Sequence, residues 1–300
     1  MFYTSGTLLL YEIAYLCIER SKTMTLKDLH KSISELGSTP LIPMLFVGHG
    51  SPMNAVEDNE FSRMWTSLGA QLPTPRAIVC ISAHWETKGT HVTIGNPLET
   101  IHDFYGFPGE LYRQKYPSPG SPSLAQEVID NIQSTHVKGD DQWGLDHGTW
   151  TILKYTYPLA NIPVIQISID HDKDAQWHYN LGKELAFLRS KGVLVIGSGN
   201  MIHNLRIMRI TGNDFNAEYG YDWAFELNDI LKNKLIDGDD LSLINYRSLH
   251  KDAELAIPTP EHYIPMLYVL GLRNKDEKVR FFNDKVIAAS LNMTSFIVGE

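Results

Sequence analysis

Cysteines, basic clusters and long apolar runs are scarce in this chain of 300 residues. Its two cysteines, Cys17 and Cys80, exclude a disulfide framework and favour a reducing, cytoplasmic location. The net charge is −9 and no cluster of Lys and Arg is evident, which argues against nucleic acid or an anionic membrane surface as a partner. The apolar stretch at 8–17 contains Glu12, follows no basic residue and is too short to span a bilayer. We therefore expect neither a nucleic-acid nor a membrane partner.

The chain also lacks internal repeats, low-complexity segments and a recognisable linker, while 43% of its residues are apolar. Residues 41–300 are therefore expected to form a single α/β domain, with a central, mostly parallel or mixed sheet and helices on both faces. Residues 1–40 are interpreted as an N-terminal extension outside this domain. Translation can start at Met1 or at Met24, because apolar residues at helical spacing follow the second methionine.

Apolar runs and helical spacing predict the elements of the domain. The expected strands are 44–47, 77–83, 163–169 and 193–196, and the expected helices include 122–133, 174–190 and 222–236. The segment 44–83 is interpreted as one βαβ unit whose two strands pair in parallel. A further helix is expected to begin within 258–263, with Thr259 as its cap and Pro260 at its first position. The late runs 279–282 and 286–297 are expected to finish the sheet.

Three expected strands end in a polar, histidine-bearing segment. His49 lies between two glycines after the first strand, His84 follows the second, and His203 comes soon after the strand that ends near Gly197. His147 and His262 lie at expected helix starts. Ligands bind beyond the carboxyl ends of the strands in open α/β sheets, and imidazole suits zinc and iron, so the pattern indicates a metal site. The spacing matches no short metal motif, and each histidine taken alone is more often a turn residue.

The segment 98–122 is rich in proline, glycine and aromatic residues, which is typical of a pocket wall. Within it, the neighbours His102 and Asp103 could form a carboxylate–imidazole pair for proton transfer. Packing within the loop is an equal alternative.

Six motifs occur in order between about residue 43 and the end of the chain. They are Gly48-His49-Gly50-Ser51-Pro52, Ser82-Ala83-His84-Trp85, Ile101-His102-Asp103-Phe104, Gly144-Leu145-Asp146-His147-Gly148, Ser198-Gly199-Asn200-Met201-Ile202-His203-Asn204-Leu205 and Pro258-Thr259-Pro260-Glu261-His262-Tyr263. Together they resemble the 4,5-DOPA extradiol dioxygenase family, one of the class III extradiol dioxygenases, which are similar to the catalytic subunit of protocatechuate 4,5-dioxygenase.

The resemblance implies one divalent metal per chain, with Fe(II) in the active enzyme and Zn(II) often found on isolation. It implies that His49, His84 and His262 are metal ligands. It makes His203 either a fourth ligand or an acid/base, and His147 an acid/base. Relatives in the wider class use two histidines and a carboxylate, whereas the third position here is a histidine, and the adjacent Glu261 is expected to point elsewhere.

The implied reaction is the cleavage of a catechol by O2 to a muconic semialdehyde. The substrate-binding residues would be His102, Phe104, Tyr105 and Phe107, with the aromatic side chains packing on the substrate ring. Two alternatives remain open at this point: a zinc-dependent hydrolase that uses the same histidines, and a non-catalytic protein with a closed metal site. The chain is expected to be a monomer or a small homo-oligomer.

Overall fold

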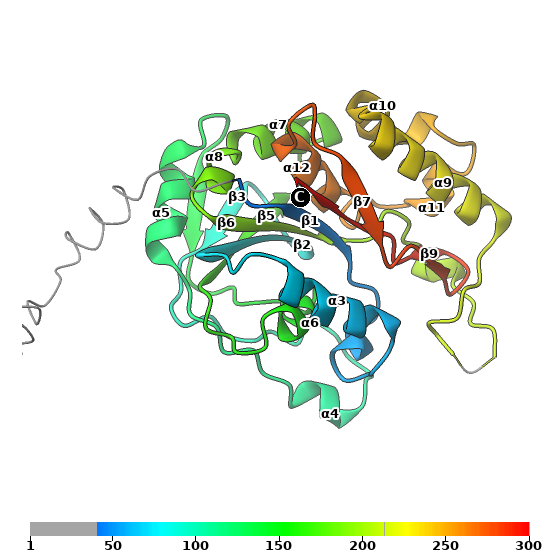
Figure 1. The fold of residues 1–300 in the computed structure, drawn as a ribbon, viewed down its shortest axis with the longest axis horizontal. Helices are drawn as coiled ribbons and strands as arrows, with labels where there is room; N and C mark the ends of the chain where they lie inside the picture. Colours follow the sequence, from blue (N-terminus) through cyan, green and yellow to red (C-terminus); the bar gives the residue numbers. More distant parts are fainter. Residues whose placement is uncertain (1–40, 213, 300) are drawn as a thin grey trace, which may run out of the picture. The chain divides into compact units, whose positions relative to one another are not determined.

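An eight-stranded mixed sheet organises the part of the chain that the computed structural model describes, residues 41–212 and 214–299 (Figure 1). Its strand order is β4-β3-β5-β2-β6-β1-β10-β7. The central strands run parallel to one another: β1 (Met44–Gly48), β2 (Ala77–Thr87), β5 (Val164–Asp170) and β6 (Val193–Gly199). The outer strands are β3 (Thr90–Thr93), β4 (Val137–Asp140), β7 (Val279–Phe282) and β10 (Ser295–Val298), and β3, β10 and β7 introduce the antiparallel pairings.

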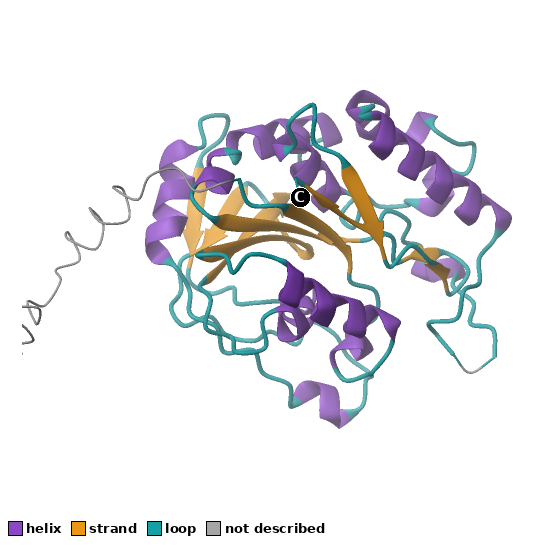
Figure 2. Ribbon diagram, in the orientation of Figure 1, coloured by secondary structure: helices purple, strands orange, loops and turns teal. Residues whose placement is uncertain are grey.

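Helices flank this sheet on both sides (Figure 2). One face packs against α3 (Glu60–Gln71) and α6 (His147–Thr156), and the other against α5 (Pro122–Asn131), α7 (Ala175–Glu184), α8 (Phe187–Ser190) and α12 (Ile264–Leu272). The remaining elements are α4 (Gly109–Tyr112), α9 (Asp222–Asp237), α10 (Asp240–Ile244), α11 (Ala253–Ala256), the 3-10 turns η1 (Pro52–Ala55), η2 (Leu205–Ile207) and η3 (Tyr246–Ser248), and the pair β8 (Val286–Ile287) and β9 (Leu291–Asn292).

The sheet has a hydrophobic core on each face because successive side chains of a strand point to opposite sides. In β1, Met44 and Phe46 join the core under α7 and α12, while Leu45 and Val47 join the core under α3 and α6. Burial on both faces explains why the central strands are almost continuously apolar in sequence. The predicted α/β domain, with a mixed sheet between two helical layers, is confirmed.

The predicted parallel pairing of 44–47 with 77–83 is wrong, because β6 lies between them. Ile196 is opposite Leu45 on one side and Cys80 on the other. The unit 44–83 is thus a crossover into which a later strand is inserted, and local patterning cannot reveal such an insertion. The predicted helix 174–190 is divided into α7 and α8.

Two expectations about the last part of the chain are also corrected. The helix expected to start within 258–263 begins instead at Ile264, with Pro265 in its first turn. Thr259 therefore caps no helix, and its hydroxyl donates to Glu261. Of the run 286–297, only its end joins the main sheet as β10, whereas β8 and β9 pair with each other.

Cys80 is a buried free thiol, and burial raises its pKa. Cys17 and the whole predicted extension, residues 1–40, lie outside the described residues, so the division of the chain at residue 40 stays a prediction. Within 41–212 and 214–299, no helix combines the length and the apolar character that a membrane span requires.

Candidate functional site

Five histidines meet at the carboxyl edge of the parallel strands. His49 directly follows β1, His84 lies near the end of β2, and His203 follows β6, while His147 is the first residue of α6 and His262 lies just before α12. The ring centroids of His49 are 4.9 Å from His84 and 5.4 Å from both His147 and His262. The expected helix start at 147 is confirmed, and Asp146 caps it.

Close contacts between backbone segments fix the positions of the His49 and His262 rings. Gly50 has a φ of +62°, a left-handed conformation that allows the chain to turn directly after His49, and Asn54 Nδ2 donates to the His49 carbonyl oxygen at 3.0 Å. The Asn200 N–H donates to the His262 carbonyl oxygen at 2.9 Å. A Cβ atom on Gly199 would lie 2.1 Å from that oxygen, so only glycine allows the segment before α12 to contact the end of β6.

The Nδ1 atom of His49 carries a proton. It lies 2.9 Å from Ser198 Oγ, and that hydroxyl donates its own hydrogen to the Gly148 carbonyl oxygen at 2.6 Å. The Ser198 oxygen must therefore accept from His49, which leaves Nε2 of a neutral His49 with a lone pair. Wherever an oxygen acceptor holds Nδ1 of a neutral imidazole, the lone pair is left on Nε2.

Carboxylates hold Nδ1 of three further histidines. Asp103 Oδ2 lies 3.1 Å from Nδ1 of His84 and 2.9 Å from Nδ1 of His147, and Asp103 Oδ1 accepts the His147 backbone N–H at 2.9 Å. Glu261 Oε1 lies 3.1 Å from Nδ1 of His262. Because a carboxylate can only accept, each of these Nδ1 atoms donates, and each neutral imidazole keeps its lone pair on Nε2.

The Nε2 atoms of His49 and His84 lie 3.0 Å apart. Two lone pairs at this distance repel unless a cation or a proton lies between them. Ligand nitrogens of His49, His84 and His147 all lie within 4.8 Å of one another. Ligand atoms of His203, Glu261 and His262 form a second such group. Imidazoles with an oxygen behind Nδ1 and a free Nε2 are the usual donor set of a metal-binding histidine cluster, so the cluster as a whole fits a divalent metal.

Burial keeps most of these imidazoles neutral. It lowers the pKa of His49 and His262 well below the usual value, and the neighbouring histidines lower it further. Burial also lowers the pKa of His203 to about 4 and, together with His84, lowers that of His147. For His84, burial acts in the same direction, but the hydrogen bond to Asp103 and the nearby carboxylates outweigh it and raise the pKa.

His203 stacks on His262. Their ring centroids are 3.5 Å apart and their planes differ by 8°. An imidazole lone pair lies in the plane of its ring, so two stacked parallel rings cannot both direct a lone pair at one point. This arrangement favours one ligand in the pair rather than two.

A cavity of about 530 Å³ opens above the histidines. Its lining includes all five rings, and its walls are largely apolar: Pro52, Met53, Phe107, Leu205, Met208, Phe215 and Leu291. An aromatic molecule of modest size fits such a space, with its ring between apolar walls and its polar groups against the imidazoles.

The expected substrate-binding residues occupy four different environments. Phe107 lines the cavity, and Phe104 is buried behind it with its ring 5.6 Å from His147. Tyr105 is 91% exposed and does not line the cavity. His102 also lies outside the lining; its ring packs against Trp150, and its Nε2 lies 3.0 Å from the Gln114 carbonyl oxygen. The position of Tyr105 and His102 gives no support to a substrate contact.

Three residues that hold the histidine rings, Asp103, Glu261 and Ser198, were not identified in that role from the sequence. Asp103 serves His84 and His147 rather than its neighbour His102. Glu261 lies in an irregular segment before α12, and its carboxylate holds the His262 ring at Nδ1, a role that was not anticipated. Ser198 had no assigned role. Their places in the quoted motifs were the available signal, but partners so distant in sequence cannot be read from spacing.

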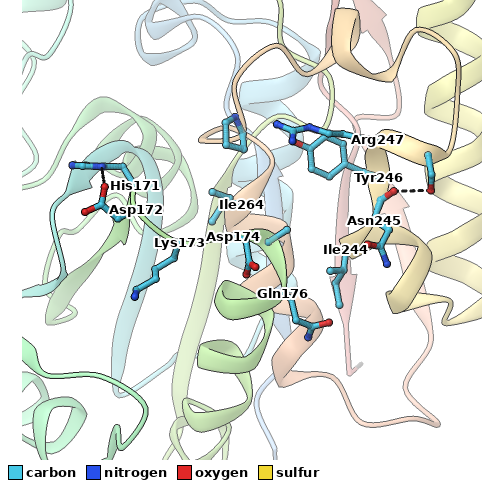
Figure 3. Close-up of a pocket in the computed structure, with 13 residues that line it drawn as sticks. His171, Asp172, Lys173, Asp174, Gln176, Ile244, Asn245, Tyr246, Arg247 and Ile264 are labelled. Carbon is cyan, nitrogen blue, oxygen red and sulfur yellow. Dashed lines mark hydrogen bonds and ion pairs between the residues drawn. The ribbon is translucent and has the colours of Figure 1, made fainter.

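A second cavity, of about 630 Å³, is larger but chemically different (Figure 3). It lies between the start of α7 and the segment around η3, and its rim carries charges of both signs, among them Asp172, Lys173 and Arg247. His171 lies there, with its Nδ1 3.0 Å from Asp172, and both side chains are about half exposed, as expected for a solvated turn. No cluster of imidazoles marks this cavity among its described lining residues.

The chain is similar to known proteins over most of its length. Residues 42–298 match the family described as the catalytic LigB subunit of aromatic ring-opening dioxygenase. A protein named 4,5-DOPA dioxygenase extradiol from Escherichia coli (strain K12) is 44% identical over 87% of this chain and 96% of its own. A protein of the same name from Beta vulgaris is 35% identical, over 80% of this chain and 90% of its own.

A solved structure agrees with these relatives. The crystal structure of an uncharacterized protein from Escherichia coli K12 has a TM-score of 0.75 and 40% sequence identity, and the match covers 86% of this chain and all of that one. The resemblance seen in the six motifs is thus confirmed: the chain belongs to the 4,5-DOPA extradiol dioxygenase family, within the LigB family of aromatic ring-opening dioxygenases, and is an oxidoreductase.

Proposed function

We propose that this protein cleaves the ring of a catechol next to its two hydroxyl groups with O2, and releases a muconic semialdehyde. The observation that carries the proposal is the convergence of imidazoles distant in sequence on one end of a largely apolar cavity, with the Nε2 atoms of His49 and His84 3.0 Å apart. The names of the relatives point to the same reaction.

His49, His84 and His262 are the proposed ligands of one divalent metal, with Fe(II) in the active enzyme and Zn(II) on isolation. When bound, the metal lowers the pKa of the catechol hydroxyls and, as iron, supplies the one-electron chemistry that O2 requires and that zinc lacks. Ser198, Asp103 and Glu261 hold the three rings by their Nδ1 atoms. Such partners fix the tautomer and orientation of a ligand.

His147 and His203 are the proposed proton carriers. Nε2 of His147 is free to accept a proton from a catechol hydroxyl, and the Asp103 carboxylate against its Nδ1 would stabilise the resulting imidazolium. His203, stacked on His262, can exchange a proton from the other side of the cluster. The apolar walls exclude water from the reacting groups.

The reaction balances without an external reductant. One ring C–C bond breaks between a hydroxyl-bearing carbon and its unsubstituted neighbour. One oxygen atom of O2 ends in the new carboxylate and the other in the new aldehyde, and the catechol supplies the electrons.

Anaerobic reconstitution with Fe(II), followed by an oxygen-electrode screen over a catechol panel, tests this function. We expect one O2 consumed for each catechol and a yellow ring-opened product, with no turnover by metal-free or zinc-loaded protein. Absence of O2 uptake by iron-loaded protein across the panel, together with ester or amide cleavage by zinc-loaded protein, would establish the hydrolase alternative instead.

The replacement His147→Ala separates a proton carrier from a ligand. We expect the variant to retain its metal and to lose roughly 10²- to 10⁴-fold in turnover, the usual contribution of a general acid or base. Metal content and kcat are measured together, with His91→Ala on β3 as a control outside the cavity. Loss of metal in His147→Ala would make His147 a ligand.

The cytoplasmic location of the protein and its state as a monomer or small homo-oligomer stay predictions.

A further inference from the structure

Glu57 is the one carboxylate among the described residues that line the cavity, and none of those residues is Lys or Arg. It lies between η1 and α3, is half-buried, and shares the lining with apolar side chains such as Phe107, Met208 and Phe215. A carboxylate in a largely apolar wall is costly to desolvate unless something compensates its charge. Its presence therefore needs a chemical explanation.

The partners of Glu57 within the described residues leave its charge uncompensated. Glu57 Oε2 accepts only long hydrogen bonds, at 3.4 Å, from the amides of Asn59 and Asn216. The backbone is well held, because Ser62 Oγ donates to the Glu57 carbonyl oxygen at 2.9 Å. The adjacent Asp58 is different: it faces solvent and pairs with Arg63 at 2.7 Å.

We propose that Glu57 binds a cationic amine on the side chain of the catechol, and so determines which catechols the enzyme accepts. This inference rests on the proposed function. A catechol whose hydroxyls face the imidazoles extends its substituent along the cavity, where an ammonium group would form a charge-assisted hydrogen bond with the Glu57 carboxylate. A carboxylate on the substrate would be repelled by Glu57 and would find no Lys or Arg among the described lining residues.

The preference is therefore for ammonium-bearing catechols, then neutral ones, then anionic ones. Three probes of similar size separate these classes: dopamine, 4-ethylcatechol and 3,4-dihydroxyphenylpropionate. Binding is measured anaerobically by calorimetry on zinc-loaded protein, so that no turnover occurs, and kcat/KM is measured on iron-loaded protein.

The variant Glu57→Gln removes the charge and keeps the shape. We expect it to weaken dopamine binding roughly 10-fold to 100-fold, the usual range for losing a charge-assisted hydrogen bond, with little change for 4-ethylcatechol. Binding of 3,4-dihydroxyphenylpropionate should become tighter, a gain that a misfolded variant cannot produce. The control Asp58→Asn makes the same change in net charge one residue away, outside the cavity lining. It should leave the affinity for each of the three probes unchanged.

Equal effects of Glu57→Gln on all three probes, or no effect on any, would overturn the role of Glu57 while leaving ring cleavage intact. Failure of the wild-type protein to bind or cleave any of the catechols would instead overturn the proposed function, and the role of Glu57 with it.

Discussion

His178 and the histidines of the cavity show two ways in which this protein buries an imidazole. His178 lies on α7 against α12, away from the cluster, with Nδ1 3.0 Å from the Tyr268 hydroxyl. Burial lowers its pKa to about 4, as it does for His203 in the cavity. Burial and a lowered pKa are thus common to both sites and do not distinguish a structural imidazole from a functional one.

The difference lies in what each ring faces. In the cavity, oxygen acceptors hold the Nδ1 atoms of His49, His84, His147 and His262, and the Nε2 atoms of His49 and His84 lie 3.0 Å apart. Among the described residues, His178 faces no second imidazole; its ring lies beside Tyr268 and Trp177. Convergent lone pairs, rather than burial, identify the metal-binding region. The two cavities differ in the same way, since the larger one has no convergent imidazoles among its described lining residues.

The largest expected effect is the loss of metal from His49→Ala. Removing one of two nitrogens that lie 3.0 Å apart removes a proposed ligand, so we expect metal-free protein and no detectable ring cleavage. The matched control is His178→Gln, which alters an equally buried histidine outside the cluster and should keep one metal per chain. Metal analysis after dialysis measures both variants. Full occupancy in His49→Ala would end its assignment as a ligand.

A smaller effect is expected from Asp103→Asn. An amide oxygen in the place of Oδ2 can still accept from both imidazoles, but it carries no charge, and the amide nitrogen would then face the His147 backbone N–H that Asp103 Oδ1 now accepts. We expect metal affinity to fall roughly 10-fold to 100-fold, as for other residues that orient metal ligands. Competition with a chromophoric chelator measures the affinity.

The control for Asp103→Asn is Asp140→Asn, which alters a carboxylate paired with His91 at 3.3 Å, outside the cavity lining. If both variants lowered metal affinity equally, the effect would come from the charge of the protein and not from the orientation of His84 and His147.

Much of the fold could be predicted from sequence, because each central strand is a local apolar run and each flanking helix has a local apolar face. Three site histidines were found for the same reason, since strand ends are locally visible and parallel strands bring their ends to one edge. What could not be predicted depends on neighbours distant in sequence. The insertion of β6 between β1 and β2 is such a case.

The loop residues of the site show the same limit more sharply. Asp103 could be paired only with its sequence neighbour His102, because nothing local shows that the loop lies over His84 and His147. Tyr105 and Phe107 are chemically similar neighbours, yet one faces solvent and the other the cavity. Irregular backbone has no fixed period, so sequence cannot assign a face to each side chain as it can in a strand.

The smallest expected effect concerns His178, the buried histidine outside the cluster, and the dependence of the free energy of unfolding on pH. The unfolded chain protonates His178 near its usual pKa of 6.5, whereas the folded protein does so only near 4. Between these values the unfolded state binds more protons, so the free energy of unfolding falls as pH is lowered from 7.5 to 5, and His178 accounts for about 2 kcal/mol of that fall. Urea denaturation of wild-type protein and His178→Gln, in the same metal state, isolates this share because the contribution of the other histidines cancels. The difference in free energy of unfolding between the two proteins should be smaller at pH 5 than at pH 7.5 by that amount. If the free energies of unfolding of both proteins instead changed equally with pH, His178 would titrate normally in the folded protein.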